Sequence, residues 1–364
     1  MKITVSRDNF QKALQKVTNI IGSRSTLPIL ANILLEVEGG ELTLTTTDLE
    51  VRVTTKITVD VEREGKTTIP AKKLLALVSK FIDNEIVLDC NEQHHTKIKC
   101  GTASFLLLGL IADDFPLPIE FSPVRTLVFE AREIARIFDQ ISYAVSLDDS
   151  RKVLHGILCS VKENTFTAVA TDGKRLALVE KILEGHTGTE GDSILPLKSA
   201  NELKRLLSGE KEVTVNIGDK QISFVTENAE LSSKLIEGNY PNYRQVIPPS
   251  FSRSVEIDSV QFQAKLELVS LALADSSAFV KLTFDKNELV FDAASANVGE
   301  GTDILPIEYD DGEVNISFNP AFLVAPFKHS EADKITIKMN DGFSPVAVEG
   351  GNGFLYVIMP MRNK

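Results

Sequence analysis

The sequence is poor in cysteine and has no apolar run long enough to cross a membrane. Cys90, Cys100 and Cys159 are its only cysteines in 364 residues. That is too few for a disulfide framework and is typical of a reducing compartment. No stretch of eighteen apolar residues occurs, and the first residues alternate as in a strand, without the apolar core of a signal peptide. We therefore expect a cytoplasmic protein that does not contact membrane.

Basic residues are outnumbered by acidic ones. The chain has 39 Lys and Arg against 51 Asp and Glu, a formal net charge of −12. Domains that hold nucleic acid by bulk electrostatic attraction usually carry a basic excess. The total charge argues against that class of protein but leaves room for a local basic surface.

The familiar catalytic motifs are also missing. There is no Gly-x-x-x-x-Gly-Lys phosphate loop, no Gly-x-Ser-x-Gly elbow and no His-Glu-x-x-His. Asp113-Asp114 and Asp148-Asp149 are paired carboxylates, but they lie in connections without a nearby histidine or nucleophile. The sequence predicts no enzyme site and no cofactor.

One group of residues has the composition of a metal site. Cys90, His94, His95 and Cys100 belong to a predicted hairpin, in which the two cysteines would face each other across the strands. Zinc fingers use more closely spaced ligand pairs. Exposed turn histidines are the better interpretation, and no metal is predicted.

What the chain does contain is one order of strands and helices repeated three times. Its length calls for two or three domains, and the 43% apolar fraction supports full folding. The prolines that close the copies lie 125 and 119 residues apart, and corresponding helix starts lie 126 and 123 apart (Pro116, Pro241 and Pro360; Pro70, Pro196 and Asn319). Two landmarks with one period predict three domains, at 1–121, 122–250 and 251–364.

Each copy combines two helices with about six to eight strands. Helices are expected at 7–21, 70–81, 131–145, 196–207, 259–273 and 319–328, and third-copy strands at 254–257, 279–284, 288–292, 334–338, 344–348 and 354–357. Ser6 is the expected N-cap of the first helix. This order predicts an α+β fold, with the helices gathered on one face of antiparallel sheet.

The positive charge is concentrated in the predicted helices. They carry 13 basic and 5 acidic residues, a net charge of +8, which leaves −20 on the rest of the chain. A single lysine-rich helix is usually just a solvated face. Because the repeat places six helices equivalently, we favour a shared cationic surface that faces a polyanion. Few aromatics accompany these charges, so the contacts should go to phosphates without reading sequence.

The stretch Ala168–Glu180, AVATDGKRLALVE, predicts a β-hairpin with a charged tip. Asp172-Gly173 supplies the positive φ angles that a tight turn needs. Taken alone, the stretch fits a surface hairpin without a ligand, or one wall of a binding groove.

The chain resembles the bacterial sliding clamp family, the beta subunits of DNA polymerase III. The residues that carry the resemblance span the sequence in the family's order: Leu27-Pro28-Ile29-Leu30, Thr47-Asp48-Leu49-Glu50, Ala170-Thr171-Asp172-Gly173-Lys174-Arg175-Leu176-Ala177, Tyr240-Pro241-Asn242-Tyr243-Arg244 and Met359-Pro360-Met361-Arg362. The resemblance implies a ring-shaped homodimer of three repeated domains per chain, with helices lining the hole and sheets outside. Such a ring would encircle double-stranded DNA and act as a processivity factor.

The resemblance also implies a pocket for short peptide motifs of glutamine and apolar residues, used by the replicative polymerase, the clamp loader and repair polymerases. Carried over by position, its residues are Leu154, Thr171, Gly173, Lys174, Arg175, Leu176, Pro241, Val246, Asn319, Phe322, Val346, Met359, Pro360, Met361 and Arg362. Leucines and methionines adapt to varied partners, while a few polar groups orient a peptide. Gln245 and Phe322 depart from the family's usual arginine and tyrosine.

Two further surfaces are implied. The residues expected to face DNA are Lys12, Arg24, Lys72, Lys73, Arg151, Lys198, Lys204 and Arg205. Those expected at the dimer interface are Phe105 and Leu107 on the last strand of copy one, and Leu273 near the end of a third-copy helix. Two alternatives stay open: a peptide-binding scaffold that does not encircle DNA, and an enzyme with an unrecognised site.

Overall fold

The computed structural model describes residues 1–22, 27–148, 150–183, 187–274 and 279–361. Within these ranges the chain forms six α-helices and 26 strands. Neighbouring strands pair antiparallel in each sheet. The α+β class with antiparallel sheets is therefore confirmed. None of the helices in these ranges is long and apolar enough to span a membrane.

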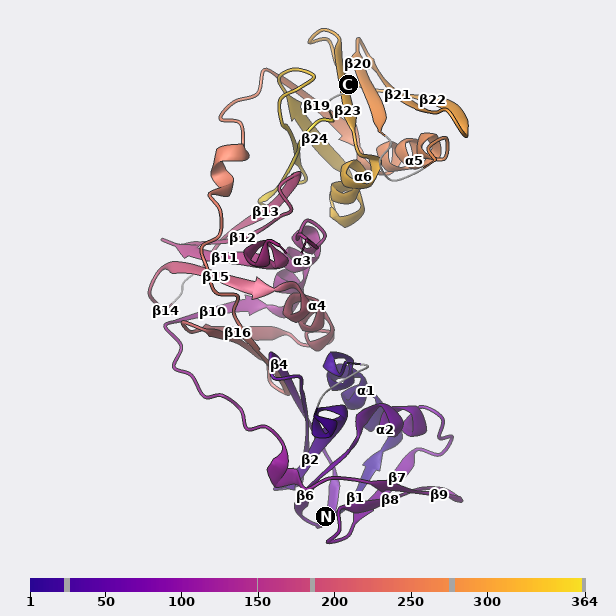
Figure 1. The fold of residues 1–364 in the computed structure, drawn as a ribbon, viewed down its shortest axis with the longest axis vertical. Coiled ribbons are helices and arrows are strands. Elements are labelled where there is room, and N and C mark those ends of the chain that lie inside the picture. Colours follow the sequence, from indigo (N-terminus) through magenta and orange to yellow (C-terminus); the bar gives the residue numbers. More distant parts are fainter. Residues whose placement is uncertain (23–26, 149, 184–186, 275–278, 362–364) are drawn as a thin grey trace. The chain divides into compact units, whose positions relative to one another are not determined.

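The chain divides into two compact units, each drawn as a group of helices and sheets in Figure 1. The N-terminal unit comprises Met1–Ala135, His186–Thr189 and Lys198–Leu235, and the C-terminal unit comprises Arg136–Gly185, Glu190–Leu197 and Ile236–Lys364. The second predicted domain is thus shared between the units. The reason is that strands of successive copies pair with one another, as described next.

The N-terminal unit contains two sheets. The first has five strands in the order β5 (Asp60–Arg63), β1 (Lys2–Ser6), β7 (Glu85–Cys90), β8 (His95–Cys100) and β9 (Ala103–Leu108). The second has nine, in the order β14 (Thr187–Gly188), β10 (Arg125–Glu130), β16 (Glu212–Ile217), β17 (Gln221–Val225), β18 (Ala229–Lys234), β4 (Val51–Thr58), β3 (Glu41–Thr47), β2 (Asn32–Glu38) and β6 (Gly65–Pro70). The β18–β4 pair joins a strand of the second copy to one of the first, which makes one continuous sheet.

Three helices belong to this unit: α1 (Arg7–Val17), α2 (Ala71–Val78) and α4 (Leu197–Leu206). Helix α1 buries the apolar face that its spacing predicts, and it ends before residue 21 because Thr18–Ile20 forms a 3₁₀ turn. Ser6 precedes α1 as expected but does not cap it. Its hydroxyl donates to Oδ1 of Asn84 at 3.2 Å instead.

The C-terminal unit also contains two sheets. The eight-stranded sheet has the order β15 (Gly191–Pro196), β11 (Gly156–Lys162), β12 (Thr165–Thr171), β13 (Arg175–Ile182), β26 (Phe354–Ile358), β25 (Val346–Glu349), β24 (Lys334–Met339) and β19 (Arg253–Asp258). The four-stranded sheet has the order β22 (Gly299–Pro306), β21 (Glu288–Ser295), β20 (Val280–Asp285) and β23 (Val314–Phe318). The β13–β26 pair joins the second copy to the third, just as β18–β4 joins the second to the first.

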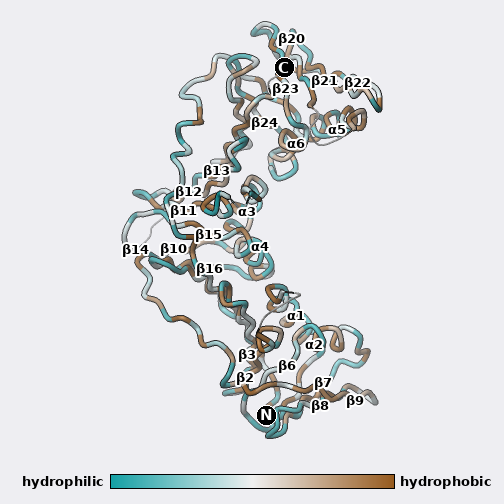
Figure 2. Tube along the Cα trace, in the orientation of Figure 1, coloured by the Kyte–Doolittle hydropathy of each residue, from teal (hydrophilic) through white to brown (hydrophobic). Residues whose placement is uncertain are grey.

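The helices of this unit are α3 (Ala131–Ser142), whose first residues fall in the N-terminal unit, α5 (Ser259–Ser270) and α6 (Pro320–His329). Asn319 caps α6 by accepting hydrogen bonds from the N–H groups of Ala321 and Phe322. Helices α5 and α6 pack through the stacked rings of Phe262 and Phe327, whose centroids lie 4.1 Å apart. The chain trace in Figure 2 shows the apolar residues distributed along these strands and helices.

Part of the third copy differs from the prediction. Strands β22 and β23 were not predicted, and β21 extends three residues beyond its predicted end at residue 292. Gly299 and Gly301 interrupt the apolar alternation of β22, and only one of its eight residues is buried. An edge strand whose helix-facing side is only partly buried has a weak apolar alternation, and that alternation is the signal by which a strand is recognised in sequence.

Candidate docking surface and family membership

The turn between β12 and β13 is held by its own side chains. The hydroxyl of Thr171 donates to the carbonyl of Arg175 at 2.6 Å and accepts from the N–H of Gly173 at 3.1 Å. Oδ1 of Asp172 accepts from the N–H groups of Lys174 and Arg175 at 2.9 and 3.0 Å. Asp172 therefore contributes an Asx turn, and of the two central residues predicted to have positive φ only Gly173 does, at 86°.

Arg175 is anchored rather than free. Its side chain is 14% exposed, and Nε lies 3.1 Å from Oδ2 of Asp172. Nη2 donates to the carbonyl of Tyr143 at 2.5 Å. The guanidinium also lies 4.3 Å from the ring centroid of Phe322, on α6. One cation thus connects the turn of the second copy to a helix of the third.

The C-terminal segment runs beside this turn. Arg175 pairs with Ile358 at the end of β26. The N–H of Met359 then donates to the carbonyl of Lys174 at 3.1 Å, and the N–H of Met361 donates to the carbonyl of Ser317 at 2.7 Å. Met359 is 39% exposed. These bonds place exposed methionine beside the hairpin tip.

An apolar cluster underlies the turn. Leu176 is 1% exposed and packs with other buried residues of β11, β12, β13, β15 and β26, and the chain that follows residue 235 covers the cluster with Tyr240, Tyr243 and Ile247. The hydroxyl of Tyr240 donates to the carbonyl of Val169 at 3.5 Å, and burial raises the pKa of this tyrosine. Burial likewise raises the pKa of Tyr143 and Tyr356, so all three phenols stay neutral at physiological pH.

The structure brings together most of the residues predicted for the pocket, all within the C-terminal unit. We use "docking surface" for the turn Thr171–Leu176, Phe322 and Met359–Met361. Pro241 and Val246 are exposed on the segment that covers the apolar cluster, and Asn319 caps the helix that carries Phe322. Leu154 and Val346 are buried, at 6% and 1% exposed. Neither is part of the exposed surface, and Arg362 lies outside the described residues.

Phe343 was not among the predicted pocket residues, and its side chain is 78% exposed. It lies in the connection from β24 to β25, where Oδ1 of Asp341 accepts from the N–H groups of Phe343 and Ser344 at 2.8 and 2.7 Å. Val346, at the start of β25, pairs with Ile358, so this connection lies at the same end of the sheet as Met359. A fixed turn that exposes a phenylalanine is the signal that would have identified it.

The residues predicted to face DNA lie in different environments. Lys12 and Lys73 are exposed, and no hydrogen bond or ion pair joins either to another residue within the described ranges. Lys72 Nζ donates to the carbonyl of Gly22 at 3.3 Å. Arg151 is exposed beside Gly173, where an added Cβ would meet its Nη1 at 2.9 Å. Arg24 lies outside the described residues.

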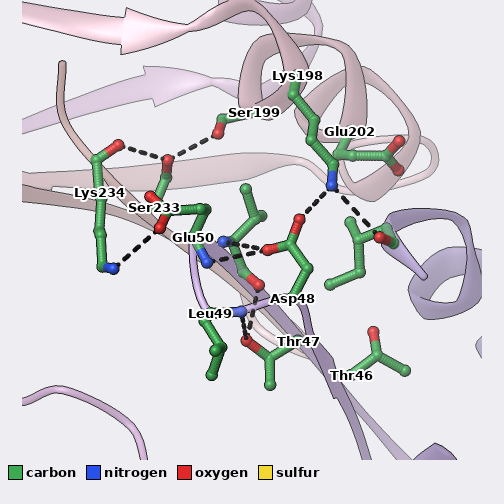
Figure 3. Close-up of polar contacts among 12 residues, drawn as sticks. Thr46, Thr47, Asp48, Leu49, Glu50, Lys198, Ser199, Glu202, Ser233 and Lys234 are labelled. Atoms are coloured by element: carbon green, nitrogen blue, oxygen red, sulfur yellow. Dashed lines mark hydrogen bonds and ion pairs between the residues drawn. The ribbon is translucent and has the colours of Figure 1, made fainter. Parts of the chain in front are cut away.

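Lys198 and Arg205, on α4, have partners inside the N-terminal unit. Lys198 contacts the carboxylate of Asp48 and donates to the carbonyl of Ile20 at 3.3 Å, and Figure 3 shows its side chain reaching Asp48. Nη1 of Arg205 lies 3.3 Å from Glu202. Lys204, between them, is half-buried. Part of the positive charge counted in the helices is therefore used within the protein.

The three predicted interface residues lie near exposed strands. Phe105 is 42% exposed on β9, the last strand of its sheet, and its ring lies 6.0 Å from that of Phe81. Leu107 is half-buried on the same strand, and Leu273 is half-buried just after α5. Helix α5 packs on β22, which is the last strand of the four-stranded sheet.

The cysteine and histidine group does not form a metal site in the described part of the chain. Cys90 pairs with Thr96, whereas Cys100 is the last residue of β8, so the two thiols do not face each other across the hairpin. Nδ1 of His94 lies 3.4 Å from the hydroxyl of Thr67. All three cysteines are free and buried.

Comparison with known proteins gives one consistent result. Family models of the DNA polymerase III beta subunit match in order: its N-terminal domain over residues 1–119, its central domain over 129–242 and its C-terminal domain over 244–362. The beta sliding clamp of Chlamydia muridarum is 30% identical over 362 residues, covering 100% of this chain and 99% of the relative. That of Pseudomonas aeruginosa is 30% identical over 367 residues, covering 100% of both.

Solved structures agree. A sliding clamp from P. aeruginosa bound to griselimycin superposes with a TM-score of 0.95 at 30% identity, and one from Bartonella birtlesii bound to griselimycin with 0.93 at 31%; each comparison covers 100% of both chains. These matches extend over all three copies of the repeat. The chain therefore belongs to the DNA polymerase III beta subunit family: it is a DNA sliding clamp, a non-catalytic processivity factor of the replicative polymerase.

Proposed function

We propose that two copies of this chain close into a ring around double-stranded DNA, with the helices of the three repeated domains lining the hole. The ring holds the replicative polymerase, the clamp loader and repair polymerases through short peptide motifs that bind the docking surface. We place the domains at 1–121, 122–250 and 251–364, and the protein in the cytoplasm, where bacterial chromosomal DNA lies.

The arrangement of the turn and the C-terminal segment is the observation that carries this proposal. The carbonyl of Lys174 accepts from Met359, and the anchored side chain of Arg175 fixes Phe322 beside them. The exposed methionine and the half-buried phenylalanine can adapt to different partner side chains, while the fixed backbone orients those side chains. The clamps of P. aeruginosa and B. birtlesii, which share the fold, bind griselimycin. We expect this chain to bind griselimycin on the docking surface.

A ring linked to DNA needs little affinity for it, and that is compatible with the charge pattern. Exposed Lys12 and Lys73 supply positive charge on the helices, and the remainder of an acidic chain repels DNA elsewhere. Contacts of this kind go to phosphates and carry no sequence preference.

The ring is tested by loading it onto circular and linear DNA with a bacterial clamp loader. We expect retention on the closed circle through a wash at high salt, and loss once the circle is cut. Equal loss from both forms would contradict a topological link. It would favour the alternative, a peptide-binding scaffold that does not encircle DNA.

The docking surface is tested separately, with a fluorescent peptide that contains glutamine followed by leucines and phenylalanine. Met359→Ala with Met361→Ala should weaken its binding about tenfold or more, because hot-spot side chains of this kind carry most of the binding energy. Leu147→Ala, at a residue that is 85% exposed and outside the surface, is the control. Unchanged affinity in the double variant would show that the surface is assigned wrongly.

A further inference from the structure

Strand β9 has an unusual composition for the edge of a sheet. It reads ASFLLL, carries no charge and no proline, and forms the free edge of the five-stranded sheet in Figure 1. Edge strands of soluble proteins are usually protected by charge, proline, a bulge or a covering segment, since an unpaired apolar edge attracts other strands. The edge at the other end of this sheet, β5, follows that rule, because it reads DVER. An unprotected edge of this length requires a partner.

Both faces of β9 are apolar. Phe105 and Leu107 pair with Ile98 and Thr96 of β8, which are fully buried, so they point to the side of the sheet that the helices cover. Leu106 lies between them and therefore points outward. It is 59% exposed, more than Phe105 at 42%.

The outward side of β9 combines leucine with neighbouring positive charge. Leu106 pairs with Lys97, and Leu108, which is 61% exposed, pairs with His95. Lys99, the next outward residue of β8, is exposed as well. The outward surface therefore places two leucines beside two lysines, and β9 appears in the colour of hydrophobic residues in Figure 2.

The four-stranded sheet of the C-terminal unit ends in a strand with a matching outward side. On β22, Gly301 and Asp303 face α5: an added Cβ on Gly301 would lie 3.4 Å from Ala272, and Asp303 lies 2.9 Å from Nζ of Lys265. The alternate residues point outward. Ile304 is one of them, at 46% exposed.

Negative charge accompanies Ile304 on that side. Glu300 is exposed and outward on β22, and the hydroxyl of Thr302 donates to Oδ1 of Asp292 on the next strand. The edge strand β9 thus presents leucines next to lysines, and the edge strand β22 presents an isoleucine next to carboxylates. The charges are complementary, and each outward side carries exposed apolar surface on its edge strand.

We propose that the ring interface is apolar on both faces of the joined sheet, with Leu106 and Leu108 of one copy packing on Ile304 of the other. The inference rests on the proposed dimer and extends it. Side chains alternate between the two faces of a strand. If the helix-side residues of the two edge strands lie next to each other across the interface, their outward residues must therefore also lie next to each other. Lys97 and Lys99 then lie on the same side of the sheet as the partner's Glu300, which disfavours a register slipped by one residue.

The test measures dimer dissociation for Leu106→Ser with Leu108→Ser by fluorescence-detected sedimentation. Losing two buried leucines at each interface should raise the dissociation constant about 100-fold or more. Both leucines are exposed within a single chain, so thermal unfolding of the isolated chain should not change. Ile182→Ser, at a residue 76% exposed on β13, is the matched control and should leave dissociation unchanged.

A charge exchange tests the contact itself. Leu106→Lys and Ile304→Glu should each raise the dissociation constant of the dimer. The double variant should have a dissociation constant at least tenfold lower than the sum of the two single effects predicts. If Phe105→Ser disrupts the dimer but the outward variants do not, the ring stands and the two-sided interface is wrong. If the unaltered chain is a monomer at micromolar concentration, both the ring and this inference are wrong.

Discussion

Asp48 and Asp172 occupy the same position in two successive copies of the repeat. Each carboxylate accepts hydrogen bonds from the backbone N–H groups two and three residues further along, at 3.0 and 2.7 Å for Asp48 and at 2.9 and 3.0 Å for Asp172. In both turns the preceding threonine donates to the carbonyl at the far end, at 2.9 and 2.6 Å. The same turn thus occurs in both copies. The two turns differ in the residue that has positive φ and in the side chain that contacts the aspartate carboxylate.

The first difference predicts a stabilising substitution. Leu49 has φ 77° where the second copy has Gly173 at 86°. A leucine in the left-handed region is strained by about 1–2 kcal/mol, and this side chain is 44% exposed, so it buries little surface in return. Leu49→Gly should therefore stabilise the N-terminal unit by about 0.5–1 kcal/mol after the entropy cost of glycine is subtracted. Chemical denaturation of the N-terminal unit measures whether the free energy of unfolding rises as expected.

The reciprocal change serves as its control. Gly173→Ala should destabilise the C-terminal unit by about 1 kcal/mol through its positive φ, and its new methyl group must displace Nη1 of Arg151. Destabilisation by Leu49→Gly as well would mean that Leu49 makes favourable contacts outweighing its strain.

The second difference predicts which lysines serve DNA. Lys198 contacts Asp48, and its side chain is 47% exposed. Lys198→Gln should cost about 0.5 kcal/mol of stability, as for other exposed ion pairs, and should change the salt dependence of DNA binding little. Lys73→Gln should do the reverse, lowering the slope of log K against log salt by about 0.9 with no effect on unfolding. Equal slopes for the two variants would show that Lys198 also contacts phosphate.

Much of this fold follows from the sequence because its periodicities are strong and occur three times. Phe10, Leu14 and Val17 repeat at helical spacing and are all buried as expected. Asn319-Pro320 begins a helix in the structure as the sequence predicts, since asparagine caps it and proline suits the first turn. The hairpin tip at Gly173 was placed correctly for the same reason, because the local turn chemistry agrees with the fold.

The parts that sequence did not predict depend on contacts between distant segments. Strand β22 has five exposed residues and one buried residue among its eight, so its sequence shows only a weak apolar alternation. The sequence does not reveal that the guanidinium of Arg175 is held by Tyr143, 32 residues away, and by Phe322. The pairing of Lys198 with Asp48, 150 residues away, likewise cannot be read from its position on a helix. The contacts of these side chains depend on burial and on pairing between segments that are distant in the sequence.

A buried thiol should make the protein less stable at high pH. Burial raises the pKa of the Cys159 thiol from 9.0 to about 12. Between these values the unfolded chain releases the proton and the folded chain keeps it, so stability falls as pH rises, by about 1.4 kcal/mol per pH unit at most. Cys159→Ala should flatten the pH dependence of the unfolding midpoint between pH 9 and 11. Parallel curves for the variant and the unaltered chain would contradict this role.

Tyr143 should contribute in the same direction from about pH 10. Burial raises its pKa, and its hydroxyl has no hydrogen-bond partner among the described residues. Tyr143→Phe should therefore raise stability by about 1 kcal/mol even at pH 7, because it removes an unsatisfied buried group. It should also reduce the loss at high pH. A lower midpoint at pH 7 would indicate that the hydroxyl has a partner in solution, such as a bound water.

Phe343 should contribute to peptide binding although it lies outside the predicted set. Its ring is 78% exposed on a turn fixed by Asp341, at the end of the sheet that carries Met359. Phe343→Ser should weaken binding of the glutamine-containing peptide about fivefold to twentyfold, as for a moderate hot spot. Fluorescence anisotropy measures the change, and Ile182→Ser is again a control for loss of exposed apolar surface. Identical affinities would restrict the surface to the hairpin and the C-terminal segment.

Arg175→Lys should separate anchoring from charge. Lysine keeps the positive charge near Asp172 but cannot also reach the carbonyl of Tyr143 and stack on Phe322, where the arginine lies at 2.5 and 4.3 Å. Because Arg175 and Asp172 are only 14% and 16% exposed, an imperfect pair should destabilise the C-terminal unit by about 2–3 kcal/mol. Lys174→Gln, at the exposed neighbouring residue, should leave unfolding unchanged. If Arg175→Lys unfolds like the unaltered chain yet loses peptide affinity, the guanidinium acts on the peptide directly and the anchoring contacts are secondary.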